Sequence, residues 1–406
     1  MAEAGWVLAT YRLVDRPDAL PARAEGIAVG LTVGSWTDLP AARQEAVRRH
    51  CGRVESVRTL GDAADGRVIA EVMIAYPEAN FTDTFSSILT TTFGKLSMDG
   101  EIRLVRLELP QSLRARLPGP RFGVGGVREW TGVHGRPLLM SIFKACVGRG
   151  LPELTEQFRA QALGGADLVK DDEIFFNESY ASPEERVRAY GEAARQVEAE
   201  TGCRVRYAVL LSGPAHRLLE RARRLCALGA GALLCNALTY GYDVLADLAA
   251  DPEVTAPLLC HPALAGALYG SETHGIAAPI VLGDLLRLAG ADIVIYPSPY
   301  GSVTLGRQDG AALVEALRRP GSHRPAMPAP SAGIFPGLVG RLVADLGPDC
   351  IVNAGGAIHG HPGGATAGGL AFRAAIDAVM AGTPLPEAAA AVPALAQALD
   401  RWGRGT

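Results

Sequence analysis

Lysine is almost absent from this chain of 406 residues. Lysine and arginine together number 39, and only Lys95, Lys144 and Lys170 are lysines, which leaves 39 − 3 = 36 arginines. A guanidinium stays protonated, so it cannot readily act as a base or react with carbon dioxide, whereas a lysine made neutral by its surroundings can do both. The three lysines are therefore the first candidates for functional positions. The alternative is that a coding bias left three lysines by chance.

Other absences narrow the class of protein. No apolar run is long enough to span a bilayer, and the first residues lack a basic segment followed by an apolar core. The net charge is −4 and no basic run occurs, which argues against a nucleic acid or an anionic membrane as partner. The seven cysteines show no CxxC spacing, and their odd number is awkward for a disulfide framework. We expect a cytoplasmic protein with reduced thiols and a small-molecule partner.

The first part of the chain has the character of an α+β domain. Its patterns predict strands over Trp6–Leu13, Val68–Ile74 and Ile102–Leu109, and helices over Leu39–His50 and Asp83–Thr92. A segment dense in proline and glycine follows at residues 117–126, which is typical of a domain boundary. We therefore predict an N-terminal α+β domain over residues 1–124 and a second domain over residues 125–406.

The second domain repeats a strand-then-helix rhythm eight times. The predicted strands are Pro137–Lys144, Ala166–Asp171, Val205–Leu211, Gly231–Cys235, Ala256–His261, Asp292–Tyr296, Arg324–Pro330 and Cys350–Ala354. Eight such units match an α/β (β/α)8 TIM barrel in number and length. A doubly wound open sheet is the alternative, but its GxGxxG sequence is missing from the first strand–helix turn.

Polar residues gather where these predicted strands end, and a barrel has its active site at the carboxyl ends of its strands. Lys144 ends the first strand, the segment Lys170 to Glu173 ends the second, and His261 ends the fifth. Gly333 follows the seventh strand, and Gly355 and Gly356 follow the eighth. Glycines at these two places often bind phosphate through bare backbone N–H groups, although a Gly-Gly pair is usually just a tight turn.

The segment at the end of the second strand predicts a metal site. Lys170 and Asp172 have the same parity, so in a strand they share one face, and Glu173 follows where the strand gives way to a loop. Carboxylates are hard oxygen ligands of the kind Mg²⁺ prefers, and a neutral Lys170 could add a third oxygen ligand as a carbamate. The alternative is a solvated loop with a few ion pairs.

At this point the sequence resembles a known family. Gly165–Glu173, Ser331–Gly333 and Gly355–Gly356 followed by Gly360–Pro362 resemble the signature segments of the RuBisCO large-subunit superfamily. The resemblance implies a ferredoxin-like N-terminal domain beside the barrel. It also implies one Mg²⁺ per subunit, held by Asp172, Glu173 and an N6-carboxylysine that CO2 forms at Lys170. The loop after the sixth strand, residues 297–306, lacks the lysine of a carboxylase, so carboxylation is not expected.

Longer segments resemble the methionine-salvage branch of the RuBisCO-like proteins: residues 30–40, 91–97, 137–144 and 297–303. This implies Mg²⁺-dependent enolisation of 2,3-diketo-5-methylthiopentyl 1-phosphate to the 2-hydroxy-3-keto-pentenyl phosphate, with Lys95 as the catalytic base. It further implies a homodimer, because in the family the N-terminal domain of one subunit covers the barrel of its partner. The implied substrate-binding residues are Lys144, Lys170, Asp171, Asp172, Glu173, His261, Gly333, Gly355 and Gly356.

Several alternatives stay open. Spacing alone does not decide between Lys95 and Lys144 as the base. The alternative for Lys95 is a surface lysine without a role in the chemistry, and the alternative for Lys144 is an ion pair with Asp172 or Glu173. Another RuBisCO-like enolase or isomerase, acting for example on 5-methylthioribulose 1-phosphate, would share the metal and phosphate sites. A non-catalytic scaffold on the same fold is the third possibility. His359 and His361 receive no functional role.

Overall fold

The computed structural model describes residues 5–34, 40, 44–176 and 178–405. The chain forms two compact units, and we treat each by itself. The N-terminal unit comprises Met1–Pro118 and Leu264–Ala289, and the barrel unit comprises Gly119–Ala263 and Gly290–Thr406. The domain boundary at residues 124 and 125 therefore stays a prediction, and it did not anticipate that Leu264–Ala289 joins the N-terminal unit.

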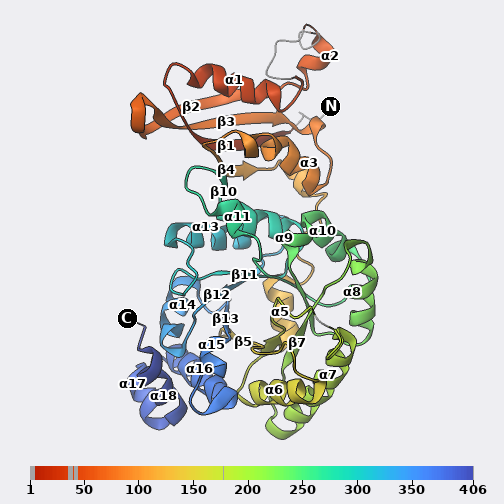
Figure 1. Cartoon of the computed structure of the whole chain (residues 1–406), viewed down its shortest axis with the longest axis vertical. Helices are drawn as coiled ribbons and strands as arrows, with labels where there is room; N and C mark the ends of the chain where they lie inside the picture. The colour runs from red at the N-terminus through yellow and green to blue at the C-terminus, as the bar shows by residue number, and fades with distance from the viewer. Residues whose placement is uncertain (1–4, 35–39, 41–43, 177, 406) are drawn as a thin grey trace. The chain divides into compact units, whose positions relative to one another are not determined.

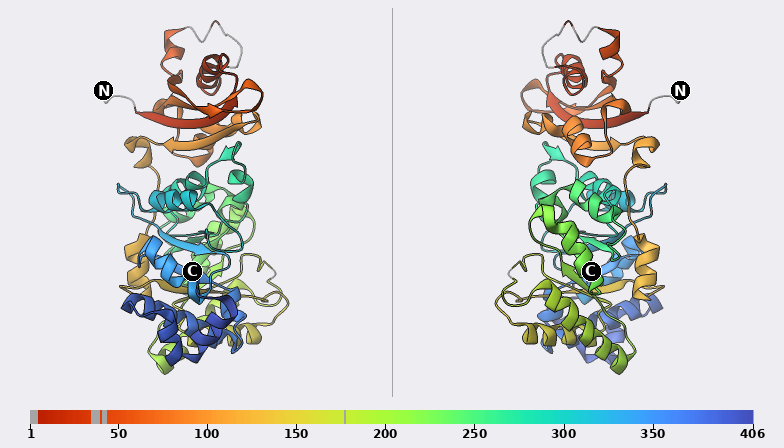
Figure 2. Two further views of the ribbon diagram at one scale, coloured as in Figure 1. Left: turned by 90° about the vertical axis from the view of Figure 1, so that its left-hand side faces the viewer. Right: turned by 90° about the vertical axis from the view of Figure 1, so that its right-hand side faces the viewer.

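The N-terminal unit is built on a five-stranded sheet. In the order β10-β4-β1-β3-β2 its strands are Gly275–Ile276, Ile102–Glu108, Trp6–Asp15, Val68–Pro77 and Arg53–Asp62. β1 lies antiparallel to both β3 and β4, and helix α1 (Leu20–Gly30) packs against β2 and β3 (Figures 1 and 2). The chain order β1-α1-β2-β3-α3-β4 with this strand order is the ferredoxin-like arrangement. The α+β prediction is confirmed.

The predicted strands β1, β3 and β4 are present, and the stretch predicted as one helix over Asp83–Thr92 is more irregular. Helix α3 (Phe85–Leu89) is capped by the Thr84 side chain, which accepts from the Ser87 N–H, and it continues into a π-helical turn at Thr90–Gly94. The helix predicted over Leu39–His50 lies partly outside the described residues; its described part contains α2 (Glu45–Arg48).

The barrel unit contains eight parallel strands, and all eight were predicted. They are β5 (Leu138–Ile142), β6 (Leu168–Lys170), β7 (Arg206–Leu210), β8 (Ala232–Cys235), β9 (Leu258–Cys260), β11 (Ile293–Pro297), β12 (Met327–Ser331) and β13 (Ile351–Ala354). Their hydrogen-bonded order runs β12-β11-β9-β8-β7-β6-β5-β13. The two ends of that order, β12 and β13, pack beside each other, so the sheet curls into a barrel (Figure 1). The doubly wound alternative is excluded.

Helices surround the strands and bury their outward faces. The longer ones are α5 (Gly123–Thr131), α6 (Leu151–Leu163), α7 (Pro183–Thr201), α8 (Leu218–Ala227), α10 (Tyr242–Ala250), α13 (Arg307–Arg318), α14 (Val339–Leu346), α16 (Gly364–Ala381) and α18 (Pro393–Trp402). Val352 and Ala354 of β13, for example, pack into a core with Leu342 of α14 and Phe372 of α16. Because side chains alternate along a strand, Asn353 between them points into the barrel. α16 and α18 lie together near the C-terminus (Figure 2).

Two whole-chain expectations also bear on the fold. All seven cysteines are free thiols, and four of them are buried. Within the described residues, every helix is too short or too polar to cross a membrane.

Candidate active site

At the end of strand β6, Lys170 and Asp172 lie on one side of the backbone, as their parity predicted. Lys170 is 1% exposed, and its Nζ donates to the Asp171 carbonyl (2.9 Å) and lies 3.4 Å from Oε2 of Glu173. Oδ2 of Asp172 accepts from Lys144 Nζ of the neighbouring strand end at 2.6 Å. Lys144 thus forms the ion pair with Asp172 that was considered as the alternative to a substrate contact. The three polar groups predicted to converge at this strand end, those of Lys170, Asp172 and Glu173, do so.

Asp171 faces the other way and has a different role. Its Oδ1 accepts from the Tyr207 hydroxyl (2.7 Å), and its Oδ2 accepts from Arg186 Nη2 (3.0 Å) and from the Leu210 N–H (2.9 Å). The side chain has no exposed surface, so the hydrogen bonds that it accepts all come from inside the protein. This burial argues against the substrate contact predicted for Asp171. The residue follows Lys170 by one, and strand alternation turns it toward helix α7.

Burial and mutual charge shift the pKa values of this group in opposite directions. Burial lowers the pKa of Lys170, and the positive charge of Lys144 adds to that effect. Burial alone would raise the pKa of Glu173, but Lys170 and His261 nearby lower it to about 2. Burial, with help from Lys170, lowers the pKa of His261 to about 4, and its Nε2 lies 3.4 Å from Oε2 of Glu173. At pH 7 the site therefore holds an ionised Glu173 beside a neutral imidazole.

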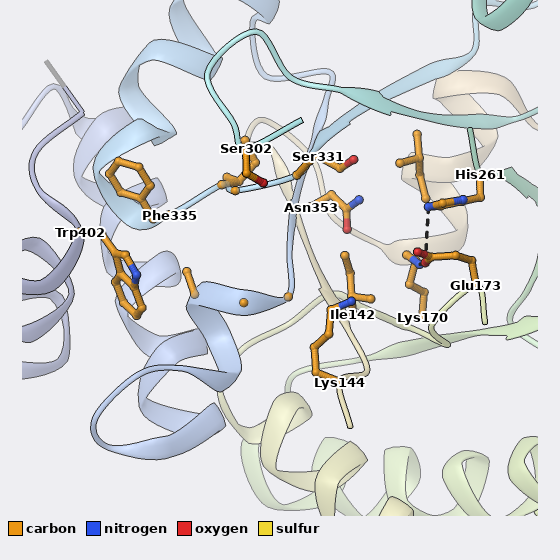
Figure 3. Close-up of a pocket in the computed structure, with 17 residues that line it drawn as sticks. Ile142, Lys144, Lys170, Glu173, His261, Ser302, Ser331, Phe335, Asn353 and Trp402 are labelled. Carbon is orange, nitrogen blue, oxygen red and sulfur yellow. Dashed lines mark hydrogen bonds and ion pairs between the residues drawn. The ribbon is translucent and has the colours of Figure 1, made fainter. Parts of the chain in front are cut away.

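One cavity of about 470 Å³ in the barrel unit collects most of the predicted site. Its walls include Lys144, Lys170, Glu173, His261, Gly333, Gly355 and Gly356. Figure 3 shows Lys170, Glu173 and His261 at one end of the cavity and the aromatic rings of Phe335 and Trp402 at the other. Lys95 belongs to the N-terminal unit. Its role as the base stays a prediction.

Two of the predicted glycines are required by close packing at the cavity wall. A Cβ on Gly355 would lie 2.9 Å from Lys144 Cε and 3.2 Å from Ile142 Cβ, so a larger residue would displace the Lys144 side chain. Gly333 has φ +89, and a Cβ there would meet the Ser302 nitrogen at 2.8 Å. Both positions therefore favour glycine for packing or backbone conformation, and both line the cavity, where backbone N–H groups could meet an anion.

The donor set fits a hard divalent cation, on one condition. Asp172 and Glu173 offer two carboxylates beside the buried Lys170 amine, and among the described residues no three His, Cys, Asp or Glu side chains cluster as a metal site. A carbamate on Lys170 would add a third oxygen ligand, and the lowered pKa of Lys170 favours the neutral amine that reacts with CO2.

The cavity also contains residues that the sequence did not single out. Asn353, Ser302, Phe335 and Trp402 line it beside the predicted residues. Strand parity could have identified Asn353, which stands two positions before Gly355 and so shares its inward face. Nothing local to Phe335 or Trp402 distinguishes them from core aromatics, since their place depends on the packing of the C-terminal helices.

His359 and His361, which received no role, make structural contacts. Nε2 of His359 lies 3.0 Å from the Ile142 carbonyl, and Nε2 of His361 lies 2.9 Å from the Ala394 carbonyl. Both rings therefore hold backbone, as expected for histidines in a glycine-rich loop.

Comparisons with known proteins show the family of the chain. Residues 123–319 and 317–402 match the family model of the ribulose bisphosphate carboxylase large chain, catalytic domain. The chain belongs to the RuBisCO large-chain family.

Individual relatives refine that assignment. The chain is 52% identical to a 2,3-diketo-5-methylthiopentyl-1-phosphate enolase from Geobacillus thermodenitrificans over 98% of each protein. It also resembles the crystal structure of a RuBisCO-like protein (MtnW) from Alicyclobacillus acidocaldarius, with a TM-score of 0.95 and 63% identity over 98% of this chain and 100% of that one. A dimeric archaeal RuBisCO from Hyperthermus butylicus has a TM-score of 0.87 and 26% identity, over 100% of this chain and 97% of that one.

Proposed function

We propose that the chain catalyses the Mg²⁺-dependent enolisation of 2,3-diketo-5-methylthiopentyl 1-phosphate in methionine salvage. The observation that carries the proposal is that one cavity is lined by Lys170 and Glu173 as well as by Gly333 and Gly355. That cavity offers a metal end and a phosphate end to one small molecule. The full-length similarity to proteins named for this activity supports the choice of substrate.

Lys170, as a carbamate, would hold Mg²⁺ together with Asp172 and Glu173. The bound ion would stabilise negative charge on a carbonyl oxygen of the substrate. In the structure, Lys144 Nζ lies 2.6 Å from Oδ2 of Asp172, and Lys170 Nζ lies 3.4 Å from Oε2 of Glu173. Lys144 would then turn from Asp172 to the substrate, and the neutral His261 would contribute a hydrogen bond at the same end of the cavity.

The reaction itself moves one proton. Lys95 would take the proton from C1, the carbon that bears the phosphate ester, and the electron pair left behind would form the C1–C2 double bond. The C2 oxygen would gain the charge and then a proton, giving the 2-hydroxy-3-keto product. The backbone N–H groups at Gly333, Gly355 and Gly356 would hold the phosphate, so that C1 stays in one place.

The role of Lys95 requires a second subunit in the family arrangement, and we propose a homodimer with the active site at the subunit interface. Surface chemistry supports it. Four large apolar side chains are exposed on the loops that follow β5 and β6, the two strands that end at Lys144 and Lys170: Val147, Ile174, Phe176 and Tyr180. Met98 is exposed three residues after Lys95. Exposed apolar side chains grouped beside a site are typical of a surface that another protein covers. A cytoplasmic location stays a prediction.

Product analysis tests the proposed activity against its nearest alternative. Purified protein with Mg²⁺ and bicarbonate would be given 2,3-diketo-5-methylthiopentyl 1-phosphate and, separately, 5-methylthioribulose 1-phosphate, with ³¹P and ¹H NMR to identify products. We expect the enol from the diketone and no change in the sugar phosphate. Isomerisation of the sugar phosphate alone would replace the proposal by the isomerase alternative, and no change in either would favour the scaffold.

A further inference from the structure

Asn353 is the unusual residue of the cavity. Its side chain is 1% exposed, and neither Nδ2 nor Oδ1 has a hydrogen-bond partner among the described residues. Two other amides in that part of the chain have a buried oxygen without a partner, but the nitrogen of each makes a hydrogen bond. Asn236 Nδ2 donates to the Glu173 carbonyl (3.0 Å), and Gln157 Nε2 donates to the Lys144 carbonyl (2.7 Å). Of the residues that the structure describes, only Asn353 has both of its amide atoms buried without a hydrogen-bond partner.

An idle buried amide is unfavourable in a folded protein. Both groups lose water on burial and gain nothing in return, so an apolar side chain of similar shape would suit the free protein better. Strained or unsatisfied groups of this kind tend to occur where a ligand completes them. The flanking Val352 and Ala354 are packed against the helices, so the barrel needs no polar group from this part of β13.

The position of Asn353 indicates which part of a ligand it would meet. Figure 3 shows it in the middle of the cavity, between the charged end at Lys170 and the aromatic end at Trp402. It precedes Gly355 by two residues on the inner face of the barrel, so it lies directly beside the proposed phosphate backbone. A molecule that spans the cavity from phosphate to metal would pass the amide with the carbons next to its phosphate-bearing carbon.

We infer that Asn353 is a substrate-binding residue that holds the oxygens on C2 and C3, the two carbons that follow the phosphate-bearing carbon C1. The inference rests on the proposed function and gives it a chemical reason. In the diketone, Nδ2 donates to one ketone oxygen while Oδ1 stays idle. In the 2-hydroxy-3-keto product, the C2 hydroxyl donates to Oδ1 and the C3 ketone accepts from Nδ2, so both amide atoms are used. The bond from Nδ2 strengthens as negative charge develops on the ketone oxygen, which lowers the barrier to enolisation, and the bond to Oδ1 forms once the C2 oxygen is protonated and stabilises the enol.

The test separates a ligand-binding role from a structural one. Asn353→Leu keeps the branched shape without polar atoms. Asn353→Ala is a smaller second variant, which removes the amide even if leucine does not fit the site. We expect both variants to fold, and the leucine variant to melt at the same temperature as the parent or higher. Both should lose about tenfold or more in kcat/KM. The matched control is Ser141→Ala on neighbouring β5, which removes a satisfied buried hydrogen bond to Gln161 (2.6 Å) that points away from the cavity. It should melt lower and keep its kcat/KM.

A binding measurement keeps the inference separate from the proposed activity. Hydroxyacetone phosphate carries a ketone beside its phosphate-bearing carbon, and n-propyl phosphate lacks it. In calorimetric titrations the parent should bind the ketone more tightly by about tenfold, and Asn353→Leu should bind the two alike. Equal binding of the two by the parent, or unchanged kcat/KM in both variants, would overturn the inference. If the parent prefers the ketone but does not enolise the diketone, the proposed function fails and the role of Asn353 stands.

Discussion

Arg186 and Asp171 form an ion pair of 3.0 Å in which neither side chain has any exposed surface. Arg186 also donates to the Tyr207 hydroxyl (3.1 Å) and the Ala181 carbonyl (2.5 Å), and its guanidinium stacks 4.3 Å above the Phe175 ring. The pair therefore joins helix α7 to the strand end between Lys170 and Asp172. The ligands of the proposed metal site stand on either side of an anchored residue, which keeps their backbone in place.

Removing that anchor should cost stability. Arg186→Met would leave the Asp171 carboxylate buried without its cation, and we expect the free energy of unfolding to fall by about 3–5 kcal/mol. Urea denaturation followed by circular dichroism measures it. Arg195→Met is the matched control, because Arg195 lies on the same helix in an exposed pair with Glu192 and should change stability by about 0–1 kcal/mol. Equal losses in the two variants would show that the buried pair is not an anchor.

At the proposed metal site, Lys144 would compete with the ion for Asp172. Its Nζ lies 2.6 Å from Oδ2, so binding of a cation there has to displace it. Lys144→Met should bind Mg²⁺ at least as tightly as the parent in the presence of bicarbonate, while turnover falls because the substrate loses a cationic contact. Titration calorimetry measures the first and enzyme kinetics the second. Lys144→Arg retains the charge, so tighter Mg²⁺ binding by that variant as well would contradict the competition.

Lys170 should form a carbamate. The parent protein with Mg²⁺ and ¹³C-bicarbonate should give a carbamate signal in ¹³C NMR, because burial favours the neutral amine that reacts with CO2. With only three lysines in the chain, single substitutions assign the signal directly. Lys170→Met should abolish it, whereas Lys144→Met should retain it. A signal that survives in Lys170→Met would place the carbamate elsewhere.

Lys95 should be needed for chemistry and not for the fold of the barrel. Lys95→Arg keeps the positive charge but cannot accept a proton at neutral pH, so we expect kcat to fall by about 10²–10⁴-fold with Mg²⁺ binding unchanged. Kinetics and calorimetry on the same preparation check this. Turnover close to the parent value would move the base to another residue, of which Lys144 is the first candidate.

Mixed dimers test whether two subunits share a site. If Lys95 serves the barrel of its partner, a dimer of one Lys95→Arg and one Lys170→Met subunit contains one intact site and one doubly altered site. Random mixing of the two inactive variants, by mild dissociation and reassociation, should then restore about a quarter of the parent activity. Activity that stays at the level of the separate variants would contradict a shared site.

Much of the barrel and of its site follows from sequence pattern. Buried parallel strands such as β7 and β11 read as short apolar runs between helices, and the polar residues at their ends mark the catalytic face. Parity along one strand separated Lys170 and Asp172 from Asp171, although the family resemblance then drew Asp171 into the substrate site, where its buried contacts argue against it.

The parts that sequence did not predict depend on contacts between distant segments. Strand β2 is an edge strand whose side chains are almost all exposed, so it has no alternation of apolar and polar residues to detect. Leu264–Ala289 interrupts the barrel rhythm and joins the N-terminal unit, where β10 pairs with β4. Asn353 becomes notable only once its burial and its lack of a partner are known.

The most direct test of the account is an ultraviolet assay of the purified protein with 2,3-diketo-5-methylthiopentyl 1-phosphate. It would be run with Mg²⁺ and bicarbonate together, with each alone and with neither, and with ribulose bisphosphate as a parallel substrate. The account predicts absorbance from a conjugated enol only when both additives are present, and no carboxylation of ribulose bisphosphate. Enol formation that needs neither additive would contradict the carbamate–metal site, and no enol under any condition would contradict the proposed reaction.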